Sequence, residues 1–567
     1  MKVQRLRLLM LLVLFVFIST IPWISSSGDM NRDSKKDLCE RVAKGNKVTY
    51  RGTRAEYFDG KHTWTIFGAT QKEAEPIIKP GNWSVGSAPY QILIVKEPIS
   101  DTPILPFSNP VPNTVNHDFL GFSAWRGEYE SPSFVLRSGE RPLEHVQIEV
   151  TDLLHTDGAG RIGRANVDAR LVKCWYQAGL NLRRNKGDKK RLTPELLLHD
   201  ADLVRVDYEN KVNLVRDIAN LQDAKALLPF DVPARTNQQL WFTFQVPKDC
   251  KSGRYNGKIQ LGFIVGGRKM MAILPVSLEV DQRVIPDPPI EYALFYMARF
   301  EPLNKGLLAR EKTEQQLEAE FRDMRAHGLT NVALDYEYRK DKSGEPDLSR
   351  LKPVLEAMRR AGFNTKRLLF VDWKLGGSQD EAEYSRKMFA LKRLAEGQGF
   401  TEVFVYNKDE QDYSGLVSNR KTFEIPHQLG MKNFVACSLK TASSMEGLLD
   451  VAIIPGKYRV KSTFCEGDNT PTCVNVTPWA YTTPQAGMET PGAYRTNYGL
   501  SLIENGYRGV CNYAYQSGDC WDDWAEVNWR PHVMAYPNLK EPIPTLQWEG
   551  FREAIDDVRK HSMLGRR

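Results

Sequence analysis

The apolar positions along the chain follow two different periods. From residue 40 to about 285, short segments alternate apolar and polar residues, which is typical of half-buried β-strands. The clearest of these segments are 91–95, 133–136, 146–150, 240–246 and 273–280. The pattern predicts a β-sandwich region of one or two units. The polar stretch around 155–215 is less regular, and we expect it to hold loops.

A proline-rich break at residues 286–289 is followed by a change of period. Helical segments now carry apolar side chains three and four residues apart, as at Leu317, Phe321 and Met324 and again within residues 351–358. Strand-like apolar runs lie between them. This alternation of helices and strands is typical of α/β units and predicts a parallel sheet.

A short glycine motif precedes several of the predicted strands. In each copy a glycine that can end a helix in the left-handed conformation is followed by an apolar residue, two turn residues and an apolar strand. The copies begin at Gly328, Gly399, Gly430 and Gly506, and Gly362 begins a variant with one extra residue. The motif indicates repeated helix–turn–strand units.

Eight such strands are expected in the second part of the chain. They lie near 292–298, 330–336, 367–373, 402–408, 432–439, 450–455, 475–481 and 507–514. Eight βα units over this length predict a (β/α)8 TIM-type barrel. An open, doubly wound sheet is the alternative, but no glycine-rich phosphate loop follows the first strand.

The first 28 residues have the features of a secretory signal. Three basic residues, Lys2, Arg5 and Arg7, precede an apolar run, and small residues follow it. An uncleaved membrane anchor is the alternative, but the run is short for a membrane span. We therefore expect a signal peptide at 1–28, a β-sandwich region at 29–285 and a catalytic barrel at 290–567. The mature protein would be secreted or periplasmic, without a membrane contact.

Net charge and cysteine spacing argue against two classes of protein, nucleic-acid-binding proteins and zinc proteins. The formal net charge of the 567 residues is +7, or near +4 without the signal, and no block of Lys and Arg suggests a nucleic-acid partner. The eight cysteines lack the spacing of a zinc site, so we expect no metal and no other cofactor. Cys465 and Cys473, and Cys511 and Cys520, are close enough in sequence to bridge surface loops. Cys437 lies in a predicted strand and is expected to be a buried free thiol.

The stretch 403–410 is the most informative for chemistry. It begins with a run of β-forming residues, 403–406, and ends in two adjacent acids, Asp409 and Glu410. In a barrel, the carboxyl end of a strand is where catalytic groups lie. Two neighbouring carboxyls repel, so one can stay ionised while the other keeps a proton, as glycoside hydrolysis requires. Acidic pairs are common on surfaces, but the position of this one after a strand favours a catalytic pair.

The carboxyl ends of the other strands would bring polar and aromatic side chains to the same end of the barrel, which we call its mouth. Carboxylates bond sugar hydroxyls, and aromatic faces stack on sugar rings, so the mouth predicts a glycan as partner. Asp335 and Asp372 could instead cap the helices that follow them. The residues expected to contact substrate are Arg299, Glu337, Asp372, Trp373, Trp479, Tyr481, Tyr513 and Tyr515.

Several segments resemble glycoside hydrolase family 123, typified by β-N-acetylgalactosaminidases. These segments are 126–134, 192–198, 246–249, 536–537 and 543–557, and the resemblance extends from about residue 85 to the end. It identifies Asp409 and Glu410 as the catalytic pair. In the closing helix Trp548, Glu549, Arg552 and Asp556 repeat the family pattern. We interpret this helix as barrel closure, with Arg552 and Asp556 as an i, i+4 pair.

The resemblance implies a substrate-assisted, retaining mechanism. The 2-acetamido oxygen of the sugar would attack C1, Asp409 would orient the acetamido group, and Glu410 would act as acid and then base. Tyr481 or Tyr513 would bond the acetamido carbonyl, and Trp479 would form the floor of the sugar site. Neighbours on a regular strand point to opposite faces, so both acids can enter the site only if the backbone is irregular at 408–410.

The leading hypothesis is therefore an exo-acting glycosidase that removes a terminal β-linked N-acetylhexosamine, with GalNAc as the expected sugar. Two alternatives stay open. One is a glycosidase of other specificity that uses Glu410 as the acid and Glu337 or Asp372 as the second carboxylate. The other is a non-catalytic glycan-binding protein on a decayed barrel. The sequence predicts no particular oligomeric state.

Overall fold

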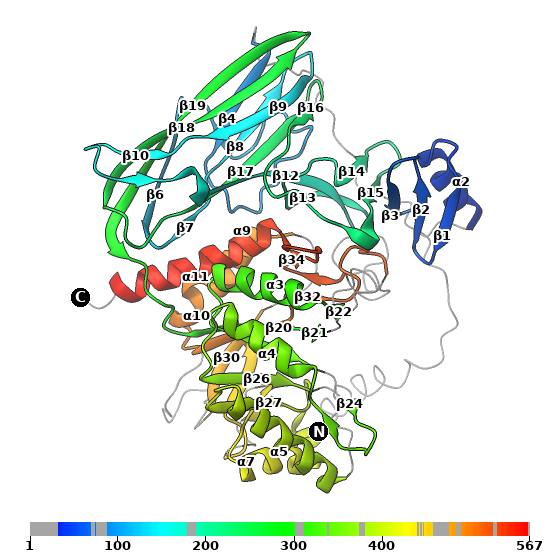
Figure 1. The fold of residues 1–567 in the computed structure, drawn as a ribbon, viewed down its shortest axis with the longest axis vertical. Coiled ribbons are helices and arrows are strands. Elements are labelled where there is room, and N and C mark those ends of the chain that lie inside the picture. Colours follow the sequence, from blue (N-terminus) through cyan, green and yellow to red (C-terminus); the bar gives the residue numbers. More distant parts are fainter. Residues whose placement is uncertain are drawn as a thin grey trace, which may run out of the picture.

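A computed structural model describes most of the chain. The described residues are 32–69, 74, 88–178, 189–300, 311–336, 339–372, 380–438, 441–442, 445, 447–456, 476–482, 489–525 and 530–564. The predicted signal peptide lies outside them. Among the helices within these ranges, we find none with the length and apolar content that a membrane span needs. The chain forms a barrel, two larger sheets beside it and a small N-terminal sheet (Figure 1).

Eight parallel strands close into the barrel that the sequence predicts. Each lies within or overlaps a predicted range, and the last strand pairs with the first. In barrel order they are β20 (Glu291–Tyr296), β23 (Asn331–Asp335), β26 (Arg367–Val371), β27 (Glu402–Tyr406), β28 (Lys432–Ala436), β29 (Val451–Pro455), β30 (Thr477–Tyr481) and β31 (Gly509–Asn512). The closed parallel order excludes the open doubly wound sheet.

The glycine motif marks the helix-to-strand turns, as predicted. Gly328, Gly362, Gly399, Gly430 and Gly506 all have positive φ, between 71° and 89°, which an L side chain adopts at a cost. The helices described between the barrel strands are α3 (Glu314–Ala326), α4 (Leu351–Arg360), α5 (Glu381–Gly397), α6 (Tyr413–Ser418), α7 (Arg420–Gln428), α9 (Pro491–Tyr498) and α10 (Leu500–Glu504), and α11 (Leu546–Leu564) follows the last strand. Their apolar faces, including residues 351–358 of α4, cover the outside of the barrel.

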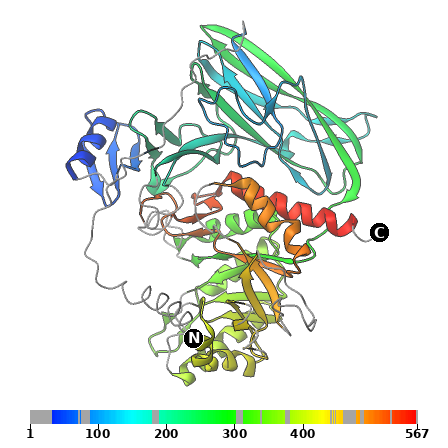
Figure 2. The same ribbon diagram turned by 180° about the vertical axis from the view of Figure 1, so that it is seen from behind.

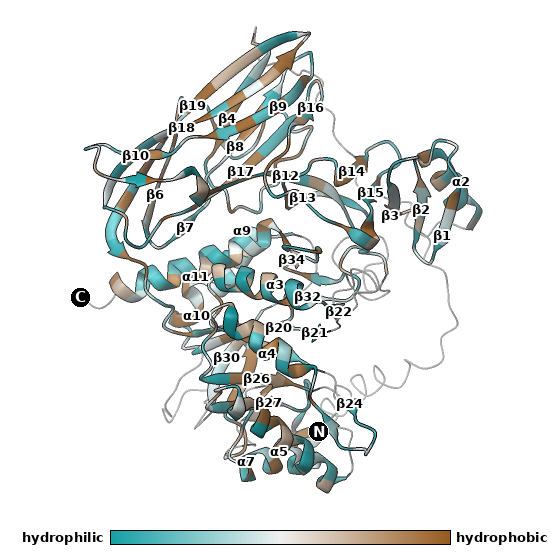
Figure 3. Ribbon diagram, viewed as in Figure 1, coloured by the Kyte–Doolittle hydropathy of each residue, from teal (hydrophilic) through white to brown (hydrophobic). Residues whose placement is uncertain are grey.

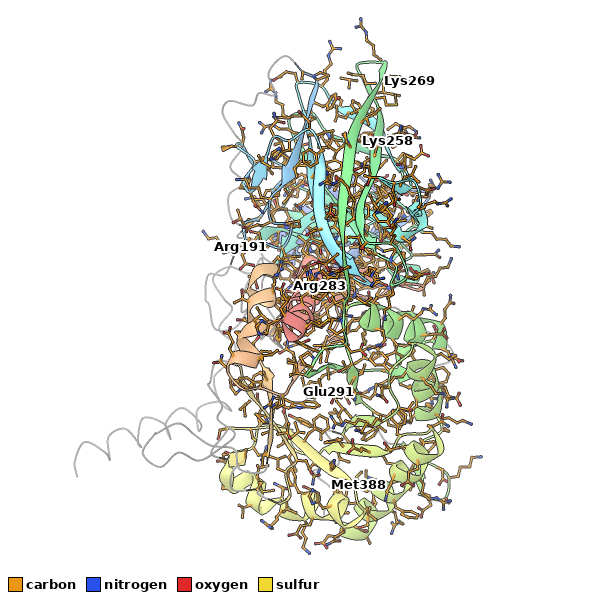
Figure 4. The ribbon with its side chains drawn as sticks, turned by 90° about the vertical axis from the view of Figure 1, so that its left-hand side faces the viewer. Arg191, Lys258, Lys269, Arg283, Glu291 and Met388 are labelled. Atoms are coloured by element: carbon orange, nitrogen blue, oxygen red, sulfur yellow. The ribbon has the colours of Figure 1, made fainter. Side chains whose placement is uncertain are left out.

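Charged residues close the end of the barrel where its strands begin. Arg367 donates to Glu291 (2.5 Å) and to Glu402 (2.9 Å), and Lys432 donates to the other oxygen of Glu402 (2.7 Å). The hydrogen bond from Lys432 is the largest cause that lowers the pKa of Glu402 to about 2. Glu291, which begins β20, is seen in Figure 4 below Arg283 near the end of β19 (Arg268–Val284). The predicted catalytic residues lie at the opposite end of the barrel, where the strands end.

Two seven-stranded sheets fill the region predicted as a β-sandwich. The first has the order β11-β10-β18-β19-β6, joined by β9 and β16, and the second β13-β12-β17-β8-β4-β5, joined by β7. Buried residues of both sheets, such as Phe134 and Phe242 of one and Leu261 and Leu278 of the other, share one hydrophobic cluster. The bounds are β4 (Tyr90–Val95), β5 (Thr114–Val115), β6 (Leu120–Arg126), β7 (Tyr129–Glu130), β8 (Ser133–Ser138), β9 (Leu143–Val150), β10 (Leu153–His155), β11 (Arg161–Ile162), β12 (Val167–Gln177), β13 (Arg191–Leu198), β16 (Phe230–Val232), β17 (Asn237–Gln245) and β18 (Gly253–Val265).

A third, five-stranded sheet was not predicted. We call it the N-terminal unit; it contains α2 (Arg32–Val42), β1 (Val48–Arg51), β2 (Arg54–Phe58), β3 (Thr63–Phe67), β14 (Val204–Asp207) and β15 (Val212–Arg216). The strand order is β1-β2-β3-β15-β14. The stretch 155–215 therefore holds regular strands where we expected loops. One of these strands, β15, pairs with β3, a partner about 150 residues away in the chain.

Helix α11 lies between the barrel and the two large sheets (Figures 1 and 2). It is buried from Leu546 to Asp556 although it carries many charged residues, visible as teal segments in Figure 3. Arg552 pairs with Glu549 and donates to Ser131 of the loop before β8 (2.7 Å), while Asp556 accepts from Arg559 (2.7 Å). The expected Arg552–Asp556 pair is thus wrong, because each residue finds a closer partner.

The cysteine predictions have mixed outcomes. Cys511 and Cys520 are separate buried thiols, so the proposed bridge between them is wrong. Cys511 lies inside a barrel strand and Cys520 on the loop beyond it, and neither is at the surface. Cys437 is buried, as expected for its position beside β28. Cys465 and Cys473 lie outside the described residues.

Candidate active site

The two predicted catalytic acids follow the fourth barrel strand. β27 ends at Tyr406, and Asp409 and Glu410 come three and four residues later in a bend. Glu410 has a φ of 45°, in the left-handed region that residues other than glycine seldom adopt. The backbone is therefore irregular where the prediction required it, and the strict alternation of a strand no longer separates the two side chains.

Asp409 is held by a tyrosine that sequence analysis did not identify as functional. The Tyr406 hydroxyl donates to Asp409 Oδ1 (2.5 Å) and accepts from the backbone N–H of Ala436 (3.2 Å). Its ring contacts Phe295 of β20, with ring centres 5.4 Å apart. Because β20 and β27 are not neighbours in the barrel, this contact places Tyr406 inside it. The signal in the sequence was its place at the end of a strand, three residues before Asp409.

The surroundings raise the pKa of both acids. Both side chains are exposed at the mouth, yet nearby protein removes part of their solvation and raises the pKa of each. For Asp409 the hydroxyl of Tyr406 opposes this shift by bonding the ionised form. For Glu410 the charge of Asp409 adds to the upward shift. Burial and the neighbouring charge together let Glu410 keep its proton to higher pH than an ordinary glutamate, while the bond from Tyr406 favours the ionised form of Asp409.

A buried hydrogen-bond network fixes the segment that leads to the acids. Tyr384 of α5 donates to Asn407 Oδ1 (2.7 Å), and Asn407 Nδ2 donates to the carbonyl of Thr422 (2.8 Å) and to Asn433 Oδ1 (3.2 Å). Asn407 is 1% exposed. Since these contacts come from two helices and the next strand, the position of the acid pair is set by the packed barrel.

Two predicted tyrosines lie at the mouth. Tyr481 is the last residue of β30 and Tyr513 directly follows β31, and both are half-buried. The ring of Tyr513 lies against Phe295 (5.6 Å between centres), on which Tyr406 also packs. Both tyrosines therefore end strands of the same barrel rim as the acid pair. This arrangement fits side chains that meet a substrate there.

The predicted carboxylates next to the acid pair are more deeply placed. Asp335 is the last residue of β23, and Asp372 directly follows β26, where its backbone N–H donates to the carbonyl of Tyr406 (3.2 Å). Their side chains are 4% and 2% exposed. Neither caps a following helix, because the N-caps of α4 and α5 are Arg350 and Asp380.

Trp479 and Tyr515 are not at the mouth, which corrects their predicted contact with sugar. Trp479 points into the barrel one layer below Tyr481; it is 2% exposed and lies over Gly509. Tyr515 lies outside the barrel, fully buried, and donates to Asp323 of α3 (2.8 Å). Strand ends were located correctly, but the depth of a side chain depends on the stagger of the strands, which periodicity does not give.

The remaining predicted residues are only partly described. Arg299 lies in β21 (Arg299–Phe300), which follows β20 and pairs with β22 (Glu311–Lys312), and it is half-buried. Glu337 and Trp373 fall outside the described residues. Within the ranges that the structure describes, no group of three His, Cys, Asp or Glu side chains converges as metal ligands.

The contact of Trp479 with Gly509 gives a first prediction. A Cβ on Gly509 would lie 2.6 Å from Nε1 of Trp479, so Gly509→Ala must displace the indole inside a packed barrel. We expect a loss of about 1–3 kcal/mol in the free energy of unfolding, measured by urea denaturation. Gly262→Ala, at a glycine with open space around its Cβ position, is the control. An equal effect of both variants would contradict the packing described here.

The comparisons with known proteins agree with this architecture. The model of the glycoside hydrolase 123 N-terminal domain matches residues 107–262. A solved family 123 glycoside hydrolase from Clostridium perfringens, studied for glycolipid glycan hydrolysis, is 13% identical, with a TM-score of 0.60 over 84% of this chain and 88% of that one. A β-glucuronidase from Parabacteroides merdae is 9% identical over 74% of this chain and 53% of its own, with a TM-score of 0.32. No curated protein matches this sequence.

The fold and the site define a class of protein: a (β/α)8 barrel with paired carboxylates at its mouth, preceded by β-sheets. Within that class the chain resembles glycoside hydrolase family 123, by its matched N-terminal domain and by the fold that it shares with the Clostridium protein.

Proposed function

We propose that the protein is an exo-acting, secreted or periplasmic glycoside hydrolase. It removes a terminal β-linked N-acetylhexosamine, with GalNAc as the preferred sugar, by a substrate-assisted retaining mechanism. The observation that carries this proposal is the adjacent pair Asp409 and Glu410 just after β27, where Tyr406 bonds the first acid, and partial burial together with the charge of the first raises the pKa of the second.

The reaction would proceed in two steps. In the first, the acetamido oxygen forms a bond to C1 as the glycosidic C1–O bond breaks, and Glu410 gives its proton to the leaving oxygen. Ionised Asp409 accepts a hydrogen bond from the acetamido N–H and stabilises the positive charge of the oxazolinium ring. In the second, Glu410 takes a proton from water, whose oxygen bonds C1 and reopens the ring. Two inversions at C1 give net retention.

The test is a pair of aryl glycosides with the same leaving group, one β-GalNAc and one β-galactose. Because the acetamido oxygen is the nucleophile, we expect kcat/KM for the N-acetylated substrate to be higher by about a thousandfold or more. Comparable rates on both sugars would favour the alternative in which Asp372 or Glu337 supplies the second carboxylate. Binding of both without any turnover would favour a glycan-binding protein.

The hydrogen bond from Tyr406 gives a second prediction, on pH dependence. Burial keeps the pKa of Tyr406 well above its ordinary value, so the hydroxyl stays a donor to Asp409. Tyr406→Phe removes a bond to the ionised form and therefore raises the pKa of Asp409. We expect the acidic limb of the kcat/KM profile to move up by about one pH unit, as for the loss of a hydrogen bond to a charge. A limb that stays in place would show that this bond does not govern ionisation of the acid.

A further inference from the structure

The N-terminal unit contacts the loop that follows the last barrel strand. Arg54, the first residue of β2, donates to Asp519 Oδ2 (2.9 Å), and the hydroxyl of Thr53 donates to Asp522 Oδ2 (2.5 Å). More than 460 residues separate the partners in the chain. We call residues 516–525 the rim loop, because they continue from β31 at the end of the barrel that carries Tyr513. The unit is thus docked on the loop that continues from Tyr513.

Close packing accompanies these polar contacts. The six-membered ring of Trp524 packs against Gly68, so closely that a Cβ on this glycine would be 2.9 Å from the ring. Asp522 is 1% exposed, and burial raises the pKa of both Asp522 and Asp519. Because a buried carboxylate is costly without a hydrogen-bond partner, Thr53 and Arg54 stabilise the ionised forms of these two acids. The N-terminal unit and the rim loop therefore form a closely packed interface, with side chains held by hydrogen bonds across it.

The rim loop is connected to a side chain at the mouth. Ser517 lies two residues before Asp519, and its hydroxyl is 3.0 Å from that of Tyr513. β32 (Gln516–Ser517) pairs with β33 (His532–Val533), and the ring of His532 packs edge-on against Tyr513 (4.8 Å between centres). In Figure 1 the N-terminal unit lies on the same side of the molecule as the labels of β21 and β32.

We propose that the N-terminal unit is a positioning element of the active site. Thr53 and Arg54 fix the rim loop, and through Ser517 the loop fixes the hydroxyl of Tyr513 at the mouth, where it meets the acetamido carbonyl of the substrate. This inference rests on the proposed function and assigns a role to a part of the chain that lies outside both the barrel and the two large sheets. Thr53 and Arg54 act through Tyr513 and do not touch the sugar.

The β1–β2 hairpin offers a matched pair of variants for the test. Arg51 and Arg54 face each other across the hairpin, but Arg51 pairs with Glu56 of the same unit at the surface (2.9 Å) and does not bond the rim loop in the described contacts. Arg54→Leu is expected to raise KM for an aryl β-N-acetylgalactosaminide by about ten- to a hundredfold, the usual effect of a displaced binding group, with a smaller change in kcat. Arg51→Leu should leave both constants unchanged, and Arg54→Lys should restore most of the affinity.

A second readout keeps the proposal independent of catalysis. Hydrogen exchange of the peptide that covers residues 513–525 should be faster in Arg54→Leu and in Thr53→Val than in Arg51→Leu. If the wild-type protein does not cleave the substrate, the proposed function fails while this exchange result still tests the docking. Wild-type KM together with wild-type exchange in both Arg54→Leu and Thr53→Val would overturn the proposal.

Discussion

Replacing Glu410 with glutamine is expected to lower kcat by about 10²–10⁴ on a substrate whose leaving group needs a proton, such as an alkyl glycoside or a disaccharide. Glutamine keeps the size and polarity of the side chain but can neither give nor take the proton. The nitrophenolate of a nitrophenyl glycoside leaves with little protonation, so the substitution should slow the first step less on such a substrate. The dependence of the loss on the leaving group is the signature of an acid catalyst.

The pH profile supplies the complementary evidence for Glu410. Its pKa is raised by partial burial and by the charge of Asp409, so the protonated acid persists to higher pH than an ordinary glutamate. The wild-type kcat/KM should fall on the basic side as pH rises through this pKa, and the residual activity of Glu410→Gln should lack that limb. Equal losses on both leaving groups, with an unchanged basic limb, would contradict the role assigned to Glu410. Gln411→Ala, at the next position, is a control for local disturbance.

Replacing Arg530 with methionine is expected to cost about 3–5 kcal/mol of stability. Arg530 is 1% exposed and donates to Asp523 (2.8 Å), to Glu195 of β13 (2.6 Å) and to the hydroxyl of Tyr536 (2.9 Å). It thereby joins the loop after β31 to the second of the large sheets. Without it, two buried carboxyls lose their cation, which is far more costly than losing an exposed pair.

Urea denaturation measures this loss, and the chain offers a suitable control. Arg235 pairs with Glu140 at the surface, and Arg235→Met should change stability by less than about 1 kcal/mol. Burial already raises the pKa of Asp523 to about 6, opposed by Arg530. Removing the arginine raises this pKa further, so the folded variant holds a proton that the unfolded chain releases, and its stability should fall as pH rises from 6 to 8. Similar losses in both variants would contradict a buried network at this junction.

The barrel could be predicted from the sequence because its signals are local. A glycine with positive φ ends a helix, an apolar residue packs and a short apolar strand begins; Gly328 and Gly399 are examples of this motif in both sequence and structure. The position of Asp409 and Glu410 followed from the same logic, because a strand that ends in charge must end at the surface. These features depend on neighbours within about ten residues.

Features that depend on distant parts of the chain could not be predicted. The five-stranded sheet of the N-terminal unit is completed by the pairing of β3 with β15, and the polar sequence of 155–215 gives no sign of that pairing. Trp479 and Tyr481 lie two residues apart on one strand face, yet only the second reaches the mouth, because the stagger of the strands sets the depth. Tyr406 looked like one more apolar strand residue, and its hydroxyl gained a role only when the chain turned back to bring Asp409 to it.

The central claim is that Asp409 stabilises an oxazolinium ring formed by the substrate itself. Calorimetric binding of a thiazoline-fused analogue of N-acetylgalactosamine, a stable mimic of that intermediate, tests it without any need for turnover. The account predicts that the wild-type protein binds the analogue at least about a hundredfold more tightly than N-acetylgalactosamine, and that Asp409→Asn loses most of this preference. Equal affinity of the wild-type protein for the two compounds, or an undiminished preference in Asp409→Asn, would contradict it.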